Sequence, residues 1–362
     1  MKIALVHDFL LKLGGAERVL KVLSDMFPSA PIYTILYDEK KVGHVFPKEK
    51  IVTSSLQKYP KFIRNRYKLL INQIPRAVEE MDLEKYDLVI SSNTAFCHGI
   101  ITSTNTKHIC YCHSPMRYAW DWTNEYQKEH EISGIKKAVY AYFMKYLREW
   151  DKIASDRPDF YIANSENVQN RIKKYYQQES TVVYPPVDVE KFKTKTTNEN
   201  YFLIISTLSP YKRIDLAVQL FNKIGRKLVI IGEGSHKEYL QSIACPNIDF
   251  LGYKDDATVK EYLENCRALI FPGEEDFGIT PVEAMACGKP VLGFGKGGLL
   301  ETVIPGETGE FFYEPNVSAM EDGLARLMYN EKFYKPHNIR KHSLKFSREI
   351  FEKNFKDILK LC

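Results

Sequence analysis

Short apolar segments alternate with amphipathic helical segments along almost the whole chain, and this alternation limits the possible folds more than any other feature. The first apolar segment, KIALVHDF, predicts a buried strand, and residues 15–27 place apolar side chains on one face at helical spacing. Further strands are predicted at YDLVISS, KHICYCHS, DFYIANS, YFLIIST, KLVIIGEG, IDFLG, ALIFPG and PVLGF. Strand–helix alternation in both halves predicts an α/β protein with two parallel sheets.

A chain of 362 residues exceeds what one hydrophobic core usually spans, so two domains are expected. The boundary is predicted near residue 183, where a Pro-Pro pair precedes a polar stretch rich in lysine and asparagine. We assign residues 1–182 to an N-terminal Rossmann-like domain, 183–337 to a C-terminal one, and 338–362 to a helix that packs back on the first. Ligands of open parallel sheets bind beyond the carboxyl ends of the strands, so an active site is expected in the cleft between two facing domains.

The composition argues against a membrane-spanning or disulfide-bonded protein. No apolar run approaches the ~18 residues that a membrane helix needs. The N-terminal segment breaks at His7 and Asp8 after four apolar residues, which is not the pattern of a signal peptide. The chain has seven cysteines, an odd number, and they are scattered along it. This argues against a set of disulfides and favours a protein of the reducing cytosol. The net charge of +5 does not by itself indicate nucleic acid. A cytoplasmic protein is expected.

The segment EEDFGITPVEAMACGKPVLGF combines two acids, a Phe-Gly turn and a helix start. Thr280 is the expected N-cap, with Pro281 as the first helical residue and Glu283 as the N3 acid of a capping box. Gly288 suits the position just past the helix end. Glu283 is therefore either a capping acid or a ligand-binding one, and local sequence leaves both alternatives open.

The same turn also suits an anion. Backbone amides over Gly278, Ile279 and Thr280, directly after Phe277, would point at a phosphate, and the helix dipole would favour its charge. Glu275 lies before the turn, where no cap needs it. We therefore expect Glu275 to accept hydrogen bonds from hydroxyl groups of a ligand.

Two other predicted strand ends carry residues suited to phosphate. Gly14 and Gly15 lie between the first strand and the first helix, where a ligand can approach the backbone closely, although such a pair is often only a turn. Lys212 and Arg213 follow a strand of the second half and suit a diphosphate, although they could equally be a solvated helix start. Neither the Gly14-Gly15 segment nor GEGSHK, with Gly232 and Gly234, has the three spaced glycines of a dinucleotide site, which argues against a nicotinamide enzyme.

The segment HICYCHSPMRYAWDW suggests a ligand rather than a metal. Strand periodicity places His108, Cys110 and Cys112 on one face and His113 on the other, and the CxxC spacing of zinc sites is absent. His113 is better interpreted as a residue at a strand end that hydrogen-bonds a ligand. The polar and aromatic residues that follow either line an acceptor groove or form a packed loop: Arg117, Tyr118, Trp120, Asp121 and Trp122.

Residues 58–76 contain six basic side chains and no acidic one, interleaved with aromatic and aliphatic residues. That composition fits a helix lying on an anionic membrane. A nucleic-acid surface would look similar, and a solvated face is the third alternative. The basic residues are Lys58, Lys61, Arg64, Arg66, Lys68 and Arg76.

Taken together, these segments resemble glycosyltransferase family 4, the retaining, nucleotide-sugar-dependent enzymes of GT-B fold. Glu275 and Glu283, with seven residues between them, match the family's E-x7-E motif and its Phe-Gly core. GGAE, YCHSPMRYAWD, YPPVD, YKRIDLA, GEG and GGLLETV occur in the family's order, so the likeness spans nearly the whole chain. Bacterial mannosyltransferases of O-antigen and capsule assembly share the PRAVE and CYCHSPMRYAWD runs.

The resemblance implies roles for the matching residues. Glu275 resembles the acid that holds the hydroxyls of the donor sugar, and Glu283 the acid that holds the nucleotide ribose. Lys212 resembles the lysine on the leaving diphosphate. Gly15 matches the loop glycine beside the phosphates, and His113 resembles the histidine near the 6-hydroxyl of the sugar.

One position departs from the family pattern. The family usually has an arginine five residues before the lysine, and this chain has Thr207 there. Arg213 could substitute for that arginine, or the grip on the phosphate is weaker.

The implied activity is retaining transfer of a hexose, mannose from GDP-mannose, to a lipid-linked saccharide in the synthesis of surface polysaccharide such as lipopolysaccharide. The resemblance places such an enzyme on the inner face of the plasma membrane, with no nucleic-acid partner. No Asp-x-Asp motif occurs in the chain, so no metal or cofactor is expected beyond the donor substrate. A GT-B nucleotide-sugar epimerase and a catalytically weak glycosyltransferase-like scaffold are the alternatives.

Overall fold

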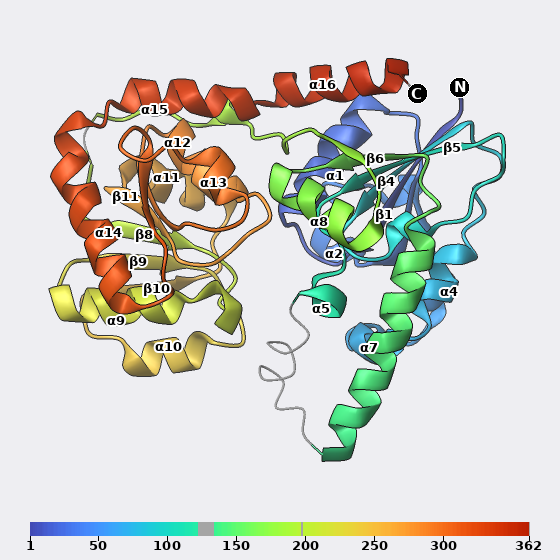
Figure 1. Ribbon diagram of the computed structural model, residues 1–362, viewed down its shortest axis with the longest axis horizontal. Coiled ribbons are helices and arrows are strands. Elements are labelled where there is room, and N and C mark those ends of the chain that lie inside the picture. The colour runs from blue at the N-terminus through green and yellow to red at the C-terminus, as the bar shows by residue number, and fades with distance from the viewer. Residues whose placement is uncertain (122–133, 197, 362) are drawn as a thin grey trace. The chain divides into compact units, whose positions relative to one another are not determined.

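The computed structural model describes residues 1–121, 134–196 and 198–361. In these ranges the strands form two fully parallel sheets, one of seven strands and one of six (Figure 1). Contacts within the chain define two compact units. The N-terminal unit is Met1–Pro186 with Glu352–Cys362, and the C-terminal unit is Val187–Phe351. The α/β fold with two parallel sheets, predicted from the alternation, is confirmed.

The sheet of the N-terminal unit has the order β3-β2-β1-β4-β5-β6-β7. The register pairs Val6 of β1 with Tyr33 of β2 and with Ser91 of β4, so β1 is an interior strand between β2 and β4. The strands are β1 (Ile3–Leu10), β2 (Ile32–Tyr37), β3 (Ile51–Thr53), β4 (Leu88–Asn93), β5 (Lys107–Cys112), β6 (Phe160–Ala163) and β7 (Ser180–Val182). The main helices are α1 (Gly15–Met26), α2 (Glu39–Val42), α4 (Ile74–Glu79), α5 (Arg117–Trp120), α7 (Gly134–Ala154) and α8 (Glu166–Tyr176).

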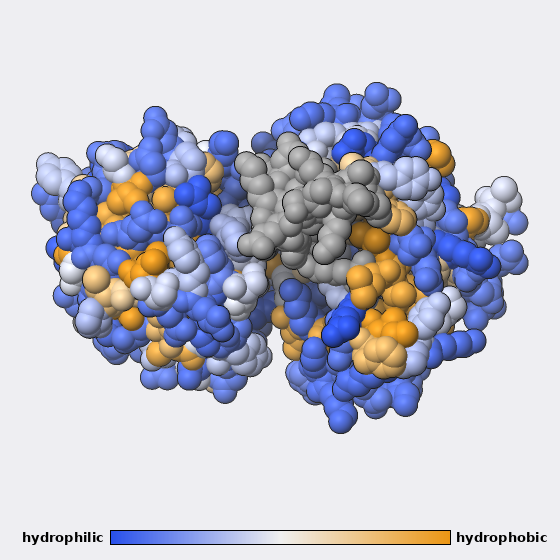
Figure 2. Space-filling view, turned by 90° about the horizontal axis from the view of Figure 1, so that it is seen from below, coloured by the Kyte–Doolittle hydropathy of each residue, from blue (hydrophilic) through white to orange (hydrophobic). Residues whose placement is uncertain are grey.

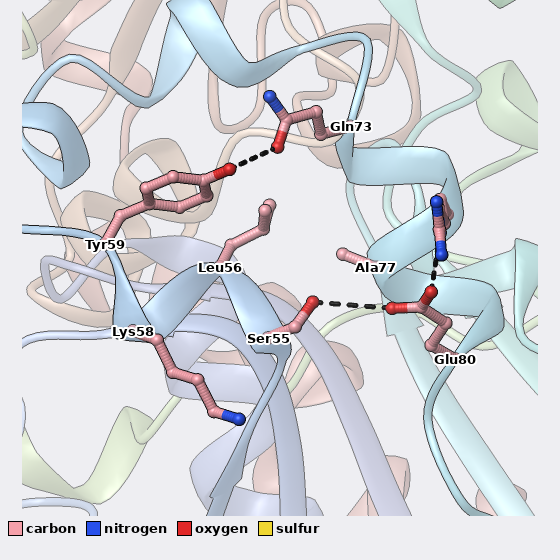
Figure 3. Close-up of a pocket in the computed structure, with 8 residues that line it drawn as sticks. Ser55, Leu56, Lys58, Tyr59, Gln73, Ala77 and Glu80 are labelled. Atoms are coloured by element: carbon pink, nitrogen blue, oxygen red, sulfur yellow. Dashed lines mark hydrogen bonds and ion pairs between the residues drawn. The ribbon is translucent and has the colours of Figure 1, made fainter.

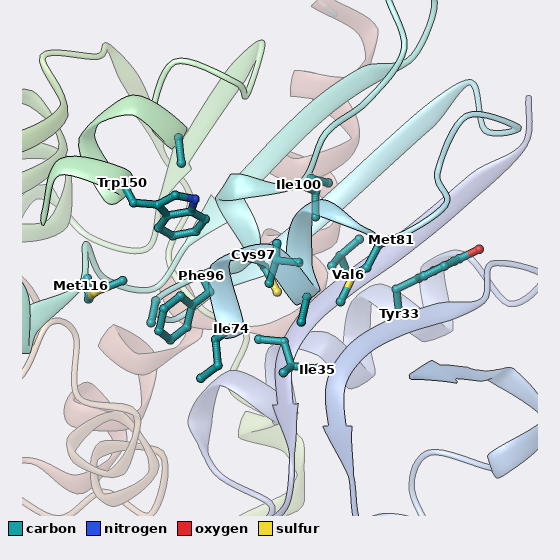
Figure 4. Close-up of a cluster of buried hydrophobic side chains, with 14 of the residues drawn as sticks. Val6, Tyr33, Ile35, Ile74, Met81, Phe96, Cys97, Ile100, Met116 and Trp150 are labelled. Carbon is teal, nitrogen blue, oxygen red and sulfur yellow. The ribbon is translucent and has the colours of Figure 1, made fainter. Parts of the chain in front are cut away.

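A large hydrophobic core of the N-terminal unit forms where α4, α7 and the short helix η4 (Cys97–Gly99) pack on the sheet. Figure 4 shows Ile74 beside Ile35 of β2, with Phe96 and Trp150 in the same cluster. Burying such side chains contributes roughly 1.5–3 kcal/mol each. Residues of both β1 and β4 belong to this core, and these two strands end at the switch point of the N-terminal sheet described below.

The sheet of the C-terminal unit has the order β10-β9-β8-β11-β12-β13, again entirely parallel. Its strands are β8 (Phe202–Ile205), β9 (Leu228–Ile231), β10 (Ile248–Gly252), β11 (Ala268–Phe271), β12 (Val291–Phe294) and β13 (Gly309–Phe312). Its helices include α9 (Ile214–Ile224), α10 (Lys237–Ile243), α11 (Asp256–Asn265), α12 (Ile279–Ala286), α13 (Leu299–Thr302), α14 (Val317–Tyr329) and α15 (Pro336–Ser343).

The last helix, α16 (Arg348–Leu361), begins in the C-terminal unit, and its residues from Glu352 onward belong to the N-terminal unit. There the Phe355 ring lies 6.4 Å from the Tyr111 ring of β5. Within the described ranges, no helix combines the length and the apolar character that crossing a membrane requires.

The basic segment does not form the single helix that its composition predicts. It is divided into η2 (Ser55–Lys58), α3 (Lys61–Arg64), η3 (Tyr67–Leu70) and α4. Pro60 ends the first turn because it has no amide to continue a helix, and Arg66 leaves helical geometry with ψ near 36°. The prediction of one continuous membrane-surface helix is therefore wrong, although the basic side chains remain close in sequence.

His108 should make the N-terminal unit sensitive to mild acid. Burial, together with the charges of His98 and Arg157, lowers the pKa of His108 to about 3. The unfolded chain then binds a proton near pH 6.5 that the folded chain does not, so stability falls as the pH drops below that value. Between pH 7 and 5, wild type should lose about 2 kcal/mol more of unfolding free energy than His108→Gln. Urea unfolding at several pH values measures this difference, and equal pH slopes would contradict the assignment.

Candidate active site

The C-terminal sheet has a topological switch point between β8 and β11. The chain connections leave these two neighbouring strands in opposite directions, which opens a crevice beyond their carboxyl ends. The segment after β8 leads into the short helix η6 (Pro210–Lys212), and the segment after β11 spans residues 272–278. The sequence-predicted residues Lys212 and Glu275 lie on these two segments.

Lys212 and Glu275 meet in a direct ion pair, Nζ to Oε1. Their side chains are 14% and 24% exposed, so the pair is screened from bulk water yet remains reachable. The Lys212 ammonium also lies 5.0 Å from the centre of the Tyr211 ring, a cation–π contact. A cation and a hydrogen-bond acceptor thus lie side by side at the place where an open parallel sheet binds its ligand.

Three glycines allow this close approach of loops. A Cβ at Gly273 would lie 3.0 Å from the Cα and carbonyl oxygen of Lys212. A Cβ at Gly297 would lie 2.3 Å from the Glu275 carbonyl oxygen, and Gly298 donates its amide to that same oxygen at 2.9 Å. The loop after β12 therefore fixes the backbone of Glu275. Gly273 and Gly297 were not identified as site residues from the sequence, because the pairing of loops is not a local signal.

Helix α12 begins earlier than predicted. Its N-cap is Gly278, with φ near 89°, and no side chain caps it. The prediction of Thr280 as N-cap and Glu283 as its capping-box partner is wrong, because the left-handed glycine turns the chain directly into the helix. The prediction for Gly288 is confirmed, since it follows the C-cap with φ near 74°.

This start leaves amides of the first turn of α12, at Ile279 and Thr280, without helical acceptors. Glu283 lies one turn further on and is only 7% exposed. Phe277 is buried, and its ring packs 5.5 Å from that of Phe346. Phe277 therefore supports the turn from the core side.

Arg213 and Thr207 also lie beyond β8. Arg213 has left-handed backbone geometry (φ 51°) at the start of α9, and its guanidinium contacts the Asp215 carboxylate at 3.2 Å. A second guanidinium nitrogen donates to the Pro315 carbonyl at 3.4 Å. Thr207 is exposed, and the glycines of the GEG segment pack closely behind it, since a Cβ at Gly232 would lie 1.8 Å from the Ser206 carbonyl oxygen.

The N-terminal sheet repeats the arrangement, with its switch point between β1 and β4. Gly14 and Gly15 follow β1 and begin α1. The Gly14 amide donates to Glu17 Oε2 at 2.7 Å. Burial raises the pKa of Glu17, but hydrogen bonds from His7 and from the backbone outweigh burial and leave this pKa below its usual value. Glu17 is therefore a buried anion behind the glycine turn.

His113 lies at the carboxyl end of β5 and is 9% exposed. Its amide donates to the Asn93 carbonyl at 2.8 Å, and its carbonyl accepts from the Asn164 side chain at 3.0 Å. Its Nε2 lies 2.8 Å from Ser92 Oγ. Ser92 was not identified as a site residue from the sequence. In the described part of the chain, no three acidic, histidine or cysteine side chains are grouped as a metal site would require.

Two family models match adjoining halves of the chain. "Glycosyltransferase Family 4" matches residues 13–191, and "Glycosyl transferases group 1" matches residues 186–345. The chain belongs to glycosyltransferase family 4.

Similar proteins agree with this assignment. The Dictyostelium discoideum alpha-1,3/1,6-mannosyltransferase ALG2 is 23% identical and covers 99% of this chain and 98% of its own. An uncharacterised glycosyltransferase of Methanocaldococcus jannaschii is 28% identical over 58% of this chain and 59% of its own length. The Anabaena protein HepE, solved in complex with UDP, superposes with a TM-score of 0.72 at 16% identity, with full coverage of both chains. The fold of this glycosyltransferase is GT-B.

The predicted acceptor residues of this family 4 glycosyltransferase are engaged by their own unit. The Trp120 indole donates to Asp151 Oδ2 at 2.7 Å and stacks on Tyr175 at 4.9 Å. Asp121 forms an ion pair with Arg171. These contacts fit the packed-loop alternative for both side chains. The remaining members, Arg117 and Tyr118, are partly buried on α5, and Trp122 lies outside the described residues.

The basic segment of the glycosyltransferase presents apolar and cationic side chains together. Phe62 is 68% exposed and Leu69 is 73% exposed, and Lys61 and Arg66 beside them are also exposed. Figure 2 shows hydrophobic side chains among hydrophilic ones on one face of the N-terminal unit. The Lys68 side chain lies outside the described part of the structure.

A surface hollow of about 480 Å³ lies next to this segment. Lys58, Tyr59 and Gln73 are among its lining residues, and Figure 3 shows the Tyr59 hydroxyl bonded to Gln73 Oε1 at 3.0 Å. Arg76 Nε donates to Glu80 Oε1 at 2.6 Å, and Figure 3 shows Glu80 on the other side of the hollow from Tyr59.

Proposed function

We propose that this glycosyltransferase transfers mannose from GDP-mannose to a lipid-linked saccharide, with retention of anomeric configuration, in the synthesis of a surface polysaccharide. The observation that carries the proposal is the meeting of Lys212 and Glu275 at the switch point of the C-terminal sheet. Mannose is supported by the ALG2 relatives, which are named as mannosyltransferases and match most of the chain. Use of a nucleotide-sugar donor is supported by the GT-B relative solved with UDP-glucose.

The chemistry follows from charge. Cleavage of the bond between the anomeric carbon and the phosphate oxygen develops negative charge on the diphosphate. Lys212 and the free amides at the start of α12 would stabilise that charge. Glu275 would release Lys212 to the diphosphate and accept hydrogen bonds from hydroxyls of the sugar. Glu283 is assigned to the ribose, and His113 to a hydroxyl of the transferred sugar.

For retention, we propose attack from the same face as the leaving group. The acceptor oxygen forms its bond to the anomeric carbon while the bond to the phosphate oxygen breaks, and the acceptor proton passes to that phosphate oxygen. No protein base is then required.

A donor assay tests the proposal directly. The purified chain should release GDP from GDP-mannose faster than UDP from UDP-glucose, and should transfer mannose to a lipid-linked saccharide. A thermal-shift screen with nucleoside diphosphates should show the largest stabilisation with GDP, about 2.7 kcal/mol at 100 times its Kd. Preference for UDP would overturn the donor assignment, and epimerised sugar without transfer would indicate the epimerase alternative.

The variant Glu275→Gln should lower kcat about tenfold to hundredfold, because charge-assisted hydrogen bonds to sugar hydroxyls contribute roughly 1.5–3 kcal/mol each. The neighbouring variant Glu274→Gln removes the same charge from the same loop and should stay near the wild-type rate. A near-wild-type rate for Glu275→Gln would refute its assigned role.

A lipid-linked acceptor would require the enzyme to work at a membrane surface, and the basic segment suits an anionic one. Replacing Lys61, Arg64, Arg66 and Lys68 with serine should weaken binding to phosphatidylglycerol-containing vesicles at least about tenfold at low salt, since each cation contributes about 1 kcal/mol. The control replaces four exposed lysines of the C-terminal unit, Lys332, Lys335, Lys341 and Lys345, and removes the same charge. Equal vesicle binding by both quadruple variants would contradict a membrane-binding role and favour the interpretation of the basic segment as a solvated surface.

A further inference from the structure

Four buried polar side chains form a continuous chain of contacts from α1 to the end of β5. Glu17 Oε1 lies 3.6 Å from His7 Nε2. His7 Nδ1 lies 3.1 Å from Ser92 Oγ, which in turn lies 2.8 Å from His113 Nε2. None of the four residues is more than 9% exposed. Because water barely reaches them, their donors need partners within the protein.

The direction of these hydrogen bonds can be derived from the atoms. His7 Nδ1 also lies 3.0 Å from the Ser92 carbonyl oxygen, which can only accept, so Nδ1 carries a proton and donates. Ser92 Oγ therefore accepts from His7. Its own hydroxyl proton is left to donate to His113 Nε2. In the reverse arrangement Ser92 Oγ would donate to an unprotonated Nδ1, and the Nδ1 lone pair would then lie 3.0 Å from the lone pairs of the Ser92 carbonyl oxygen, which is repulsive.

We propose that Ser92 and His7 are positioning residues that hold His113 in the tautomer with its proton on Nδ1. The ring then presents an N–H donor rather than a lone pair from Nδ1, which suits the oxygen of a sugar hydroxyl. The Glu17 carboxylate contacts His7 and also accepts the Gly14 amide, so one anion fixes both the glycine turn and His7. We call the four contacting side chains, Glu17, His7, Ser92 and His113, the histidine relay. The inference rests on the proposed function, in which His113 contacts the transferred sugar.

The histidine relay determines the tautomer of the His113 ring and does not determine the backbone position of His113. The backbone of His113 is held separately, by the Asn93 carbonyl and by the Asn164 side chain. Removal of the Ser92 hydroxyl should therefore leave His113 at the end of β5 and remove the Ser92 hydrogen bond from Nε2 of its ring.

Nitrogen NMR of the full-length chain labelled with ¹⁵N-histidine tests the tautomer without any assay of activity. His113 should show a protonated Nδ1 and an unprotonated Nε2, with the signal assigned by its loss in His113→Gln. Ser92→Ala should convert it to a mixture of tautomers. Ser91→Ala is the matched control, because Ser91 is equally buried on the same strand and bonds His108 Nε2 at 2.8 Å. A protonated Nε2 in wild type would overturn the proposal, whether or not any variant folds.

Kinetics supply the second readout. Ser92→Ala should lower kcat about tenfold to hundredfold with little change in KM for the donor, as misplacement of an orienting group does. Ser92→Thr should restore much of the rate because it restores the hydroxyl, and Ser91→Ala should keep the wild-type rate. Equal losses in the two alanine variants would reduce Ser92 to a structural role. Wild type that lacks transferase activity yet keeps the Nδ1–H form would refute the proposed function and support the relay.

Discussion

Replacing Lys212 with methionine should lower the rate of sugar transfer by a factor of about 10² to 10³ while the C-terminal unit stays folded. Loss of one pre-organised group that faces the developing negative charge typically has this effect. The lysine lies on a short turn beyond β8, and methionine preserves its aliphatic length, so the cost in stability should be small. Steady-state kinetics with the donor, together with circular dichroism, measure both parts of the prediction.

The control for Lys212→Met is Lys223→Met in the same unit. Lys223 is 61% exposed and paired with Glu321 on the surface, where an ion pair contributes little. Lys212→Arg provides a further comparison, since it keeps the charge but not the compact ammonium. Transfer at the wild-type rate by Lys212→Met would show that the diphosphate is stabilised elsewhere.

Replacing Asp8 with alanine should destabilise the N-terminal unit by at least about 4 kcal/mol. The Asp8 carboxylate is fully buried in β1 and accepts the backbone amides of Ala95, Phe96 and Cys97, each at 2.9 Å, as well as the amide and hydroxyl of Thr94. Alanine would leave this group of donors unsatisfied in the interior, where each costs roughly 1–3 kcal/mol. Urea unfolding followed by tryptophan fluorescence measures the change.

The pKa of Asp8 agrees with this role. Burial raises the pKa, but hydrogen bonds from Thr94 and the charge of His7 outweigh burial and leave it below the usual value. The carboxylate therefore contributes stability above the unfolded pKa, and this contribution is lost as the pH falls through the lower folded value. Asp25→Ala is the control, because Asp25 is a partly exposed acid of the same unit that pairs with Lys21. A loss below about 1 kcal/mol in Asp8→Ala would contradict the assignment.

Much of the fold could be predicted from local patterns. The strands at KIALVHDF, YDLVISS, ALIFPG and PVLGF and the helix beginning at Gly15 are confirmed. Four strands in the described part of the chain were not predicted: β2 (Ile32–Tyr37), β3 (Ile51–Thr53), β7 (Ser180–Val182) and β13 (Gly309–Phe312). Of these, β3 and β7 have only three residues, which is too short for periodicity to show. The basic segment was predicted as one helix because composition does not report where Pro60 and Arg66 interrupt the backbone.

Some residues of the candidate site could likewise be predicted from the sequence, and others could not. Glu275, Lys212 and His113 could be identified as candidates because they follow strands and match spaced motifs. Glu17, His7 and Ser92 could not be identified in this way. An acid in a first helical turn usually caps the helix, and a polar residue within a strand usually hydrogen-bonds a nearby group. The only signal was the interruption of the first apolar strand by His7 and Asp8.

The sequence by itself determined that the chain forms two parallel α/β sheets, because the spacing of apolar residues along a strand or helix is local information. The tertiary structure alone decided that β8 lies beside β11 and β1 beside β4. These neighbours bring the Lys212 ammonium to the Glu275 carboxylate and Ser92 to His7 and His113. The physical reason is that strand order depends on how the helices pack over the whole sheet. The energy of that packing comes from many core residues that are distant in sequence, so no single segment predicts it.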